Sequence, residues 1–174
     1  NQFPNDFLKK LVQAGYPISP LHGIDGMNAA FAAYPTPRQF DDIFRDWLVA
    51  NQLNDPSVDP KYAYTYGGVL LKPLGKTYVN PNTGSQTDTV SRLGADYITF
   101  SNGSNLTITF SSNSSNVLVR AIELGVSSKR VVEVPLGTPF MDTAFGTTYT
   151  SITFVVLNSS GSADAEYSYQ ATGT

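Results

Sequence analysis

The sequence contains no cysteine, only one histidine and few charged residues for its length. Without cysteine there is no disulfide, no thiolate nucleophile and no zinc site with cysteine ligands. Charged residues make up 14% of the chain, whereas globular proteins average roughly 25%. This polar but weakly charged composition is typical of extracellular β-proteins. We therefore expect a secreted or cell-surface location. We also expect a bacterial source, because cysteine is missing.

Two classes of partner are also disfavoured. The net charge is −3 and the eleven basic residues are scattered along the chain, whereas a nucleic-acid surface needs clustered Lys and Arg. We expect no nucleic-acid partner. No apolar run approaches the roughly 20 residues that a membrane-spanning helix needs, so no membrane span is expected. The chain begins at Asn1 without Met, and we expect it to be a processed or excised fragment of a larger protein.

The first part of the chain has helical periodicity, which predicts about three short helices. The first spans residues 5–15 and the second runs from Asp25 to Ala33. The third begins at Thr36-Pro37-Arg38-Gln39, a capping box with proline at the first helical position. Its predicted apolar face consists of Phe40, Ile43, Phe44, Trp47, Leu48 and Leu53, and its predicted solvent face of Asp41, Asp42, Arg45 and Asp46.

The second part of the chain has the alternation of β-strands. Seven strands are expected, namely Val69–Lys72, Tyr97–Ser101, Asn105–Ser111, Val117–Leu124, Arg130–Val134, Ser151–Leu157 and Ala165–Gln170. The third and fourth of these are predicted to form a hairpin across residues 112–116. Short strands separated by Gly, Asn and Ser are typical of an antiparallel sandwich, either jelly-roll or Ig-like.

The predicted fold class is therefore α+β, with a short helical segment ahead of a β-sandwich. We expect the helical segment over residues 1–54, a linker over 55–68 and the β-sandwich domain over 69–174. The proline- and aspartate-rich stretch from Asn54 to Pro60 marks the change between the two parts.

Residues with catalytic or metal-binding chemistry are sparse, and we predict no catalytic residue, metal ligand or cofactor. His22 is the only histidine, which excludes an H-E-x-x-H zinc site because that motif needs two. Asp41, Asp42 and Asp46 are near enough in sequence for paired-carboxylate chemistry, but a solvated helix face explains them better. Likewise Asp55, Ser57 and Asp59 alternate like the start of a calcium loop, but a proline-punctuated linker is the better interpretation.

Two sets of surface residues are candidates for contact or modification. Tyr62, Tyr64 and Tyr66 alternate and are predicted to form an exposed aromatic strip suited to stacking on sugar rings. Four sequons, at Asn102, Asn105, Asn113 and Asn158, are possible glycosylation sites. A chain rich in Asn, Ser and Thr also produces sequons by chance.

The segment from Phe40 to Leu53, FDDIFRDWLVANQL, resembles one found in large secreted bacterial zinc metallopeptidases of the immune inhibitor A-like kind. Gly23–Phe31 is similar to the short helix before it, and Leu93–Ile98 to the entry of a following β-domain. In that family the segment follows a catalytic helix carrying H-E-x-x-H. None of the family's zinc ligands or its general base has a counterpart here, so no catalytic residue is carried over. The resemblance implies the C-terminal part of such a protein.

Three functional hypotheses follow. The first is a non-catalytic extracellular module, the C-terminal fragment of a metallopeptidase-like protein, whose partner is the rest of the parent. The second is a structural subunit of an extracellular filament or surface assembly built by strand addition, whose partner is the chain itself. The third is a carbohydrate-binding module that uses the tyrosine strip. The first is favoured.

Overall fold

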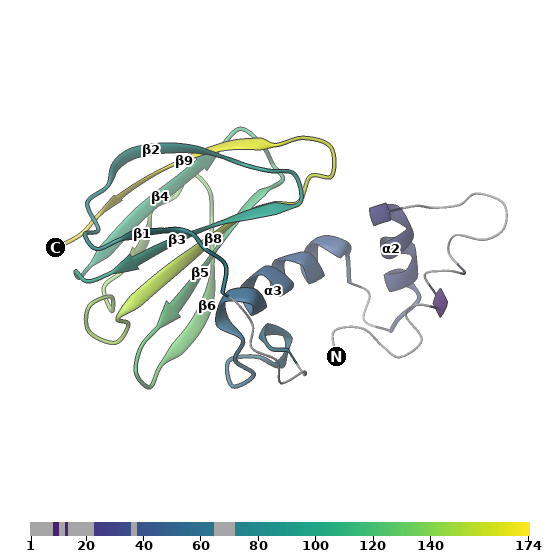
Figure 1. Ribbon diagram of the computed structural model, residues 1–174, viewed down its shortest axis with the longest axis horizontal. Coiled ribbons are helices and arrows are strands. Elements are labelled where there is room, and N and C mark those ends of the chain that lie inside the picture. The colour runs from purple at the N-terminus through teal and green to yellow at the C-terminus, as the bar shows by residue number, and fades with distance from the viewer. Residues whose placement is uncertain (1–8, 11–12, 14–22, 36–37, 65–71) are drawn as a thin grey trace.

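The computed structural model describes residues 9–10, 13, 23–35, 38–64 and 72–174. This part of the chain contains two α-helices, α2 (Gly23–Ala32) and α3 (Phe40–Leu53), and a short 3-10 helix at Pro60–Tyr62. Two of the three predicted helices are thus present in the described residues, and the helix predicted over 5–15 lies mostly outside them. Figure 1 shows a two-layered β-structure with α3 beside it, and α3 lies between the β-structure and α2.

The β-structure has two sheets that face each other. In the described residues the strands are β1 (Lys76–Tyr78), β2 (Gly84–Val90), β3 (Gly94–Ser101), β4 (Leu106–Ser112), β5 (Val117–Leu124), β6 (Lys129–Val134), β7 (Phe140–Asp142), β8 (Ser151–Asn158) and β9 (Ala165–Thr172). One sheet has the order β1-β3-β8-β5-β6 and the other β2-β9-β4-β7. All neighbours are antiparallel except β1 and β3. The α+β sandwich is thus confirmed, while its finer assignment as jelly-roll or Ig-like stays a prediction.

Six of the seven predicted strands are present with small shifts at their ends. The remaining predicted strand, Val69–Lys72, lies almost entirely outside the described residues. Strand β2 was not predicted because its sequence, GSQTDTV, is polar on both faces. Strands β1 and β7 have three residues each, which is too short for a periodic pattern.

The predicted hairpin between β4 and β5 is wrong. Strand β4 pairs with β7 and β9, whereas β5 pairs with β6 and β8 in the other sheet. The connection therefore crosses from one layer to the other. This arrangement lets Ile108 and Phe110 of β4 share the buried interior with Val119 and Ala121 of β5, because apolar faces of two packed sheets must meet.

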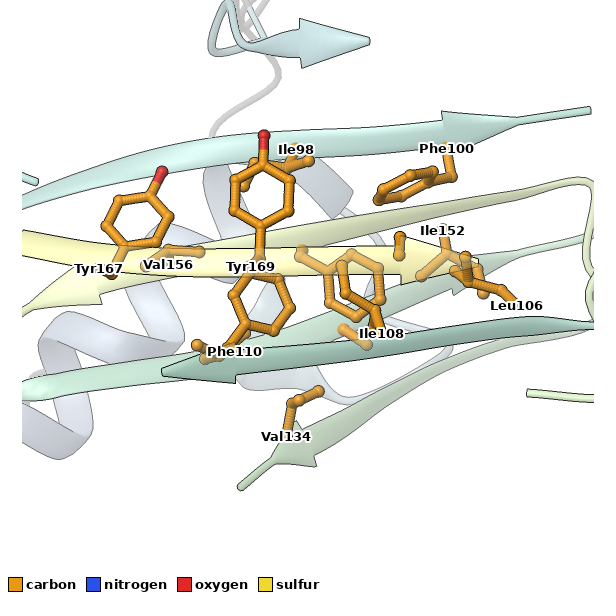
Figure 2. Close-up of a cluster of buried hydrophobic side chains, with 14 of the residues drawn as sticks. Ile98, Phe100, Leu106, Ile108, Phe110, Val134, Ile152, Val156, Tyr167 and Tyr169 are labelled. Carbon is orange, nitrogen blue, oxygen red and sulfur yellow. The ribbon is translucent and has the colours of Figure 1, made fainter. Parts of the chain in front are cut away.

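The interior between the sheets is rich in aromatic rings (Figure 2). Phe110 lies with its ring centroid 5.2 Å from that of Phe154 and 5.6 Å from that of Tyr169. Figure 2 shows the hydroxyl groups of Tyr167 and Tyr169 pointing to the same side of this cluster. Each has a polar partner, since Tyr167 donates to Asp96 at 3.0 Å and Tyr169 lies 2.7 Å from the hydroxyl of Tyr78. The rings are thus buried without leaving a polar atom unpaired.

Helix α3 packs on the outer face of the five-stranded sheet. Its Phe44, Leu48 and Val49 form one buried cluster with Tyr62 and with four residues of the sheet, Tyr97, Ile122, Val155 and Leu157. The hydroxyl of Tyr97 donates to the carbonyl of Leu48 at 2.9 Å, and burial raises the pKa of Tyr97 to about 12. The central strand β8 is consequently buried on both faces, which explains its continuous apolar sequence.

The helix is rotated relative to its predicted orientation. Trp47, expected in the apolar face, is 46% exposed, while Asp46, expected in solvent, is 2% exposed. Asp46 faces Arg120 of β5, so its attraction to that guanidinium turns the next residue, Trp47, outward. The start of the helix also differs from the prediction, because the N-cap is Gln39, whose backbone N–H donates to Asp42 at 3.0 Å.

The rotation of α3 predicts that truncating Leu48 destabilises the protein more than truncating the larger Trp47. Leu48→Ala removes a buried side chain, and we expect it to lower the free energy of unfolding by about 2–5 kcal/mol. Trp47→Ala removes a larger side chain that is half in water, so a smaller loss is expected. Urea unfolding followed by far-UV circular dichroism measures both. A larger loss for Trp47→Ala would show that the Trp47 side chain is buried, as predicted from the sequence.

Candidate functional site

A groove lies between α3 and strands β5 and β6. One part has a volume of about 510 Å³. Its apolar lining consists of Val117, Leu118, Val119, Val134, Pro135 and Leu136. A second part of about 460 Å³ is lined by charged residues of α3 and of both strands, and Arg45, Arg120 and Glu133 line both parts. The groove is therefore apolar at one end and charged at the other.

Strand β6 ends early, and this creates the apolar end of the groove. Its last residue, Val134, pairs with Val119, while Val117 and Leu118 of β5 pair only with β8. Pro135 follows directly and has no N–H to continue the ladder. The side of β5 that faces the groove is consequently uncovered over its first two residues.

The charged end is organised around the buried carboxylate of Asp46. Arg120 donates to Asp46 at 2.8 Å, and Arg38 forms a second ion pair with the other carboxylate oxygen. Arg120 also donates to the hydroxyl of Tyr62 at 3.1 Å and to Glu133 at 3.1 Å. The side chain of Asp46 is only 4% exposed. Since a buried charge is stable only with partners, these contacts hold α3 in one position on the sheet.

A second carboxylate, Asp42, lies nearer the surface at the start of α3. It accepts from the backbone N–H of Gln39 and forms an ion pair with Arg45. The hydrogen bond from Gln39, followed by the contact with Arg45, lowers the pKa of Asp42. Asp42 and Asp46 are thus both paired with guanidinium groups, which favours a structural role for the two carboxylates. Paired acid–base chemistry would need one of them protonated.

The predicted aromatic strip is divided by the fold. Tyr62 is 6% exposed and belongs to the cluster beneath α3. Tyr64 is half-buried and its hydroxyl donates to Asn51 of α3. Tyr66 lies outside the described residues, as does His22. Tyr62 and Tyr64 therefore do not form an exposed platform, and stacking of a sugar ring on them would require α3 to move.

The four sequons differ in accessibility. Asn102, Asn105 and Asn113 are exposed, and the first two have positive φ angles of 68° and 51°, a conformation that Asn adopts more readily than most residues. Asn158 is fully buried, and its amide nitrogen donates to the carbonyl of Ala163 at 2.9 Å. A glycan on Asn158 would thus require this amide to leave the folded interior. Glycosylation of the three exposed asparagines stays a prediction.

The residues with calcium-loop spacing have local partners. Asp55 accepts from Ser57 and forms an ion pair with Lys129 of β6. The hydrogen bond from Lys129, with those from Ser57, lowers the pKa of Asp55 to about 2. Asp59 caps the 3-10 helix by accepting from the backbone N–H of Lys61. In the described part of the chain, no group of three or more metal-ligating side chains is placed to hold an ion.

Sequence reasoning missed two buried carboxylates at one end of the sandwich. Glu123 of β5 is fully buried and pairs with Arg130, while one of its oxygens has no hydrogen-bond partner. Asp142 of β7 is 3% exposed and also has one unpaired oxygen. Burial, opposed by the hydrogen bond from Arg130 and reinforced by the charge of Asp142, raises the pKa of Glu123. The burial of these two carboxylates follows from the registers of β5 and β7, which turn both side chains toward the interior.

The chain was compared with known proteins. No family model matches the sequence, and no curated protein is significantly similar to it. Solved structures give partial likenesses. The mitogen of Yersinia pseudotuberculosis is 23% identical, with a TM-score of 0.40 over 54% of this chain and 87% of its own. A periplasmic inhibitor of g-type lysozyme from Salmonella Typhimurium is 12% identical, with a TM-score of 0.39 over 57% of this chain and 100% of its own.

The third likeness is the pre-peptidase C-terminal domain of a Bacillus anthracis collagenase. It is 11% identical, with a TM-score of 0.41 over 57% of this chain and 95% of its own. Scores this low assign neither a family nor a function. Within the described residues, neither helix has the length and apolar character needed to cross a bilayer.

The burial of Asp46 predicts a large effect for a small change. Asp46→Asn leaves Arg120 without its main counter-charge, and we expect the free energy of unfolding to fall by about 3–5 kcal/mol. The matched control is Asp42→Asn in the same helix, where the carboxylate is 39% exposed and a loss of about 1 kcal/mol is expected. Chemical denaturation measures both. Equal losses would mean that Asp46 is not the buried anchor of α3.

The raised pKa of Glu123 predicts a pH dependence of stability. A carboxyl group whose pKa is higher in the folded state contributes most below its unfolded pKa, near 4.5, and loses that contribution as the pH rises through the folded pKa. Glu123→Gln keeps the neutral form at all pH values. We therefore expect the free energy of unfolding of the variant to rise relative to that of the wild type between about pH 4 and pH 7. Urea unfolding at the two pH values measures this difference. If the gain in unfolding free energy of the variant stayed constant or shrank between the two pH values, the raised pKa of Glu123 would be contradicted.

Proposed function

We propose that this chain is a non-catalytic extracellular module of a secreted bacterial metallopeptidase-like protein, in which α3 joins the β-sandwich to the rest of the parent. One observation carries this proposal. The segment from Phe40 to Leu53, on which the family resemblance depends, is the helix that packs on the sandwich. The resemblance and the β-structure therefore belong to one packed unit.

The other side of α3 supports a connecting role. Ile43 of α3 forms a second buried cluster with Ala30 and Phe31 of α2. In addition, the side chain of Asn28 accepts from the backbone N–H of Phe40 at 2.6 Å. Helix α3 is thus covered by the sheet on one side and by α2 on the other. Such a helix transmits the position of the sandwich to whatever precedes it, which is the task of an accessory module that orients or retains a catalytic domain.

The absence of catalytic activity is part of the proposal. The carboxylates of the charged groove are engaged by arginines, and its other half is lined by aliphatic side chains. An extracellular location is proposed from the composition, which is rich in uncharged polar residues and lacks cysteine. The groove would then bind a peptide or a surface of the parent, and hydrolysis would occur elsewhere.

Two measurements test this proposal. The gene should encode an H-E-x-x-H segment upstream of Asn1 in the same reading frame. The purified chain supplied with zinc should not hydrolyse casein, whereas a longer protein that includes that segment should, and a Glu→Gln change in its H-E-x-x-H motif provides the control. Zinc-dependent hydrolysis by the chain alone, or an upstream sequence without the motif, would contradict the proposal.

A further inference from the structure

Strand β6 lies at the edge of the five-stranded sheet with one side unpaired. It pairs with β5 from Lys129 to Val134, and no hydrogen bond from the described residues reaches the backbone groups on its other side. An exposed edge of this kind is a template for another strand. The edge is six residues long, whereas the outer strand at the opposite edge of the same sheet, β1, has three.

The side chains of β6 alternate between the two faces of the sheet. Glu133 is opposite Arg120, whose guanidinium reaches α3, so Glu133 lies on the outer face. Lys129 and Val131 share that face, because successive side chains of a strand point to opposite sides. Arg130, which is opposite the buried Glu123, lies on the inner face.

The outer face of β6 is self-complementary in charge. The order is Lys129, Val131, Glu133, with the apolar residue in the middle and opposite charges at the two ends. If the strand pairs with a second copy of itself in antiparallel orientation about Val131, each Lys129 stands opposite Glu133 of the second copy. The two Val131 side chains then face each other. Oppositely charged and β-branched cross-strand pairs both stabilise a sheet.

No neighbouring register has this property. Residues directly opposite in an antiparallel pair lie on the same face, so the two-fold axis must pass through a residue and not between two residues. Centring on Val132 places Glu133 opposite Val131, and centring on Arg130 places Lys129 opposite Val131. Only the register about Val131 pairs both charges.

The other long edge lacks this complementarity. Strand β2 is the outer strand of the four-stranded sheet, and its only ionisable residue is Asp88. Self-pairing about Thr87 would place Asp88 opposite Gln86, and pairing about Asp88 would place two carboxylates opposite each other, which is destabilising. The charge pattern thus singles out β6.

We propose that β6 is a dimerisation edge, at which a second copy of this chain pairs antiparallel about Val131 and joins the two five-stranded sheets into one. The contact is isologous, because the same strand is used by both copies. It also consumes the edge, so association through β6 stops at two copies and does not build a filament. This inference does not depend on the proposed function of the chain.

The two charged side chains are accessible, although each has a partner within its own chain. Lys129 is 41% exposed beside Asp55, and Glu133 is 72% exposed beside Arg120 and Arg45. Arg120 retains Asp46 when Glu133 shifts toward a second copy. Because one pair of strands forms a small interface, we expect a weak dimer that is populated at protein concentrations of about 100 µM and above.

Charge reversal with mixing tests the register. In Lys129→Glu and in Glu133→Lys, both cross-strand pairs become like-charged, and we expect the Kd of each homodimer to rise about tenfold or more. When the two variants are mixed, each cross-strand pair of the heterodimer again joins one acidic and one basic side chain. A heterodimer at least as stable as the wild-type dimer is therefore expected, measured by sedimentation equilibrium.

The design separates pairing between copies from contacts within one chain. Each variant loses its intrachain ion pair whether or not it is mixed, so recovery on mixing reports only on contact between copies. Lys76→Glu, with the same charge change on β1 beside Asp88, is the control and should leave the Kd unchanged. Thermal unfolding confirms that the variants are folded. A wild type that stays monomeric up to about 1 mM, single variants that associate like the wild type, or a mixture without heterodimer would each overturn the proposal.

Discussion

The carboxylate of Asp46 is the contact on which the arrangement of helix and sandwich depends. It joins three segments, since Arg38 precedes α3, Asp46 lies within it and Arg120 belongs to β5. An apolar helix face on a sheet tolerates some rotation and sliding, because hydrophobic contact is not directional. A buried carboxylate between two guanidiniums does not, because any displacement leaves a charge unpaired in the interior. The ion pairs thus select one register of α3 on the sheet.

This position of α3 determines which parts of the five-stranded sheet remain accessible. With α3 in place, the middle of the five-stranded sheet is buried on both sides, while the edge at β6 and the groove beside it stay accessible. Arg120 connects the interior to that edge, because it binds buried Asp46 and exposed Glu133 with the same guanidinium. A partner that engages Glu133 therefore contacts the ion-pair network that positions α3.

The strands with alternating apolar residues were predicted well because alternation is a local property that one buried face imposes on the chain. Strand β2 was missed because it lies at an edge and has polar residues on both faces. The β4–β5 hairpin was predicted wrongly because short connections are usually hairpins, whereas here the two apolar faces meet across the interior. The charged groove was not predicted at all. Asp46 and Arg120 are 74 residues apart, and no local pattern links them.

The sequence by itself determined the class of the fold, the positions of most strands and of α3, and the chemistry that is excluded by the lack of cysteine and the single histidine. These follow from composition and from periodicity, which depend on near neighbours along the chain. The tertiary structure alone decided that Asp46 is buried and Trp47 exposed, that Tyr62 lies beneath α3, and that Asn158 is in the interior. The rotation of a helix and the partner of a strand are set by contacts between distant segments, and periodicity does not encode which segments will meet.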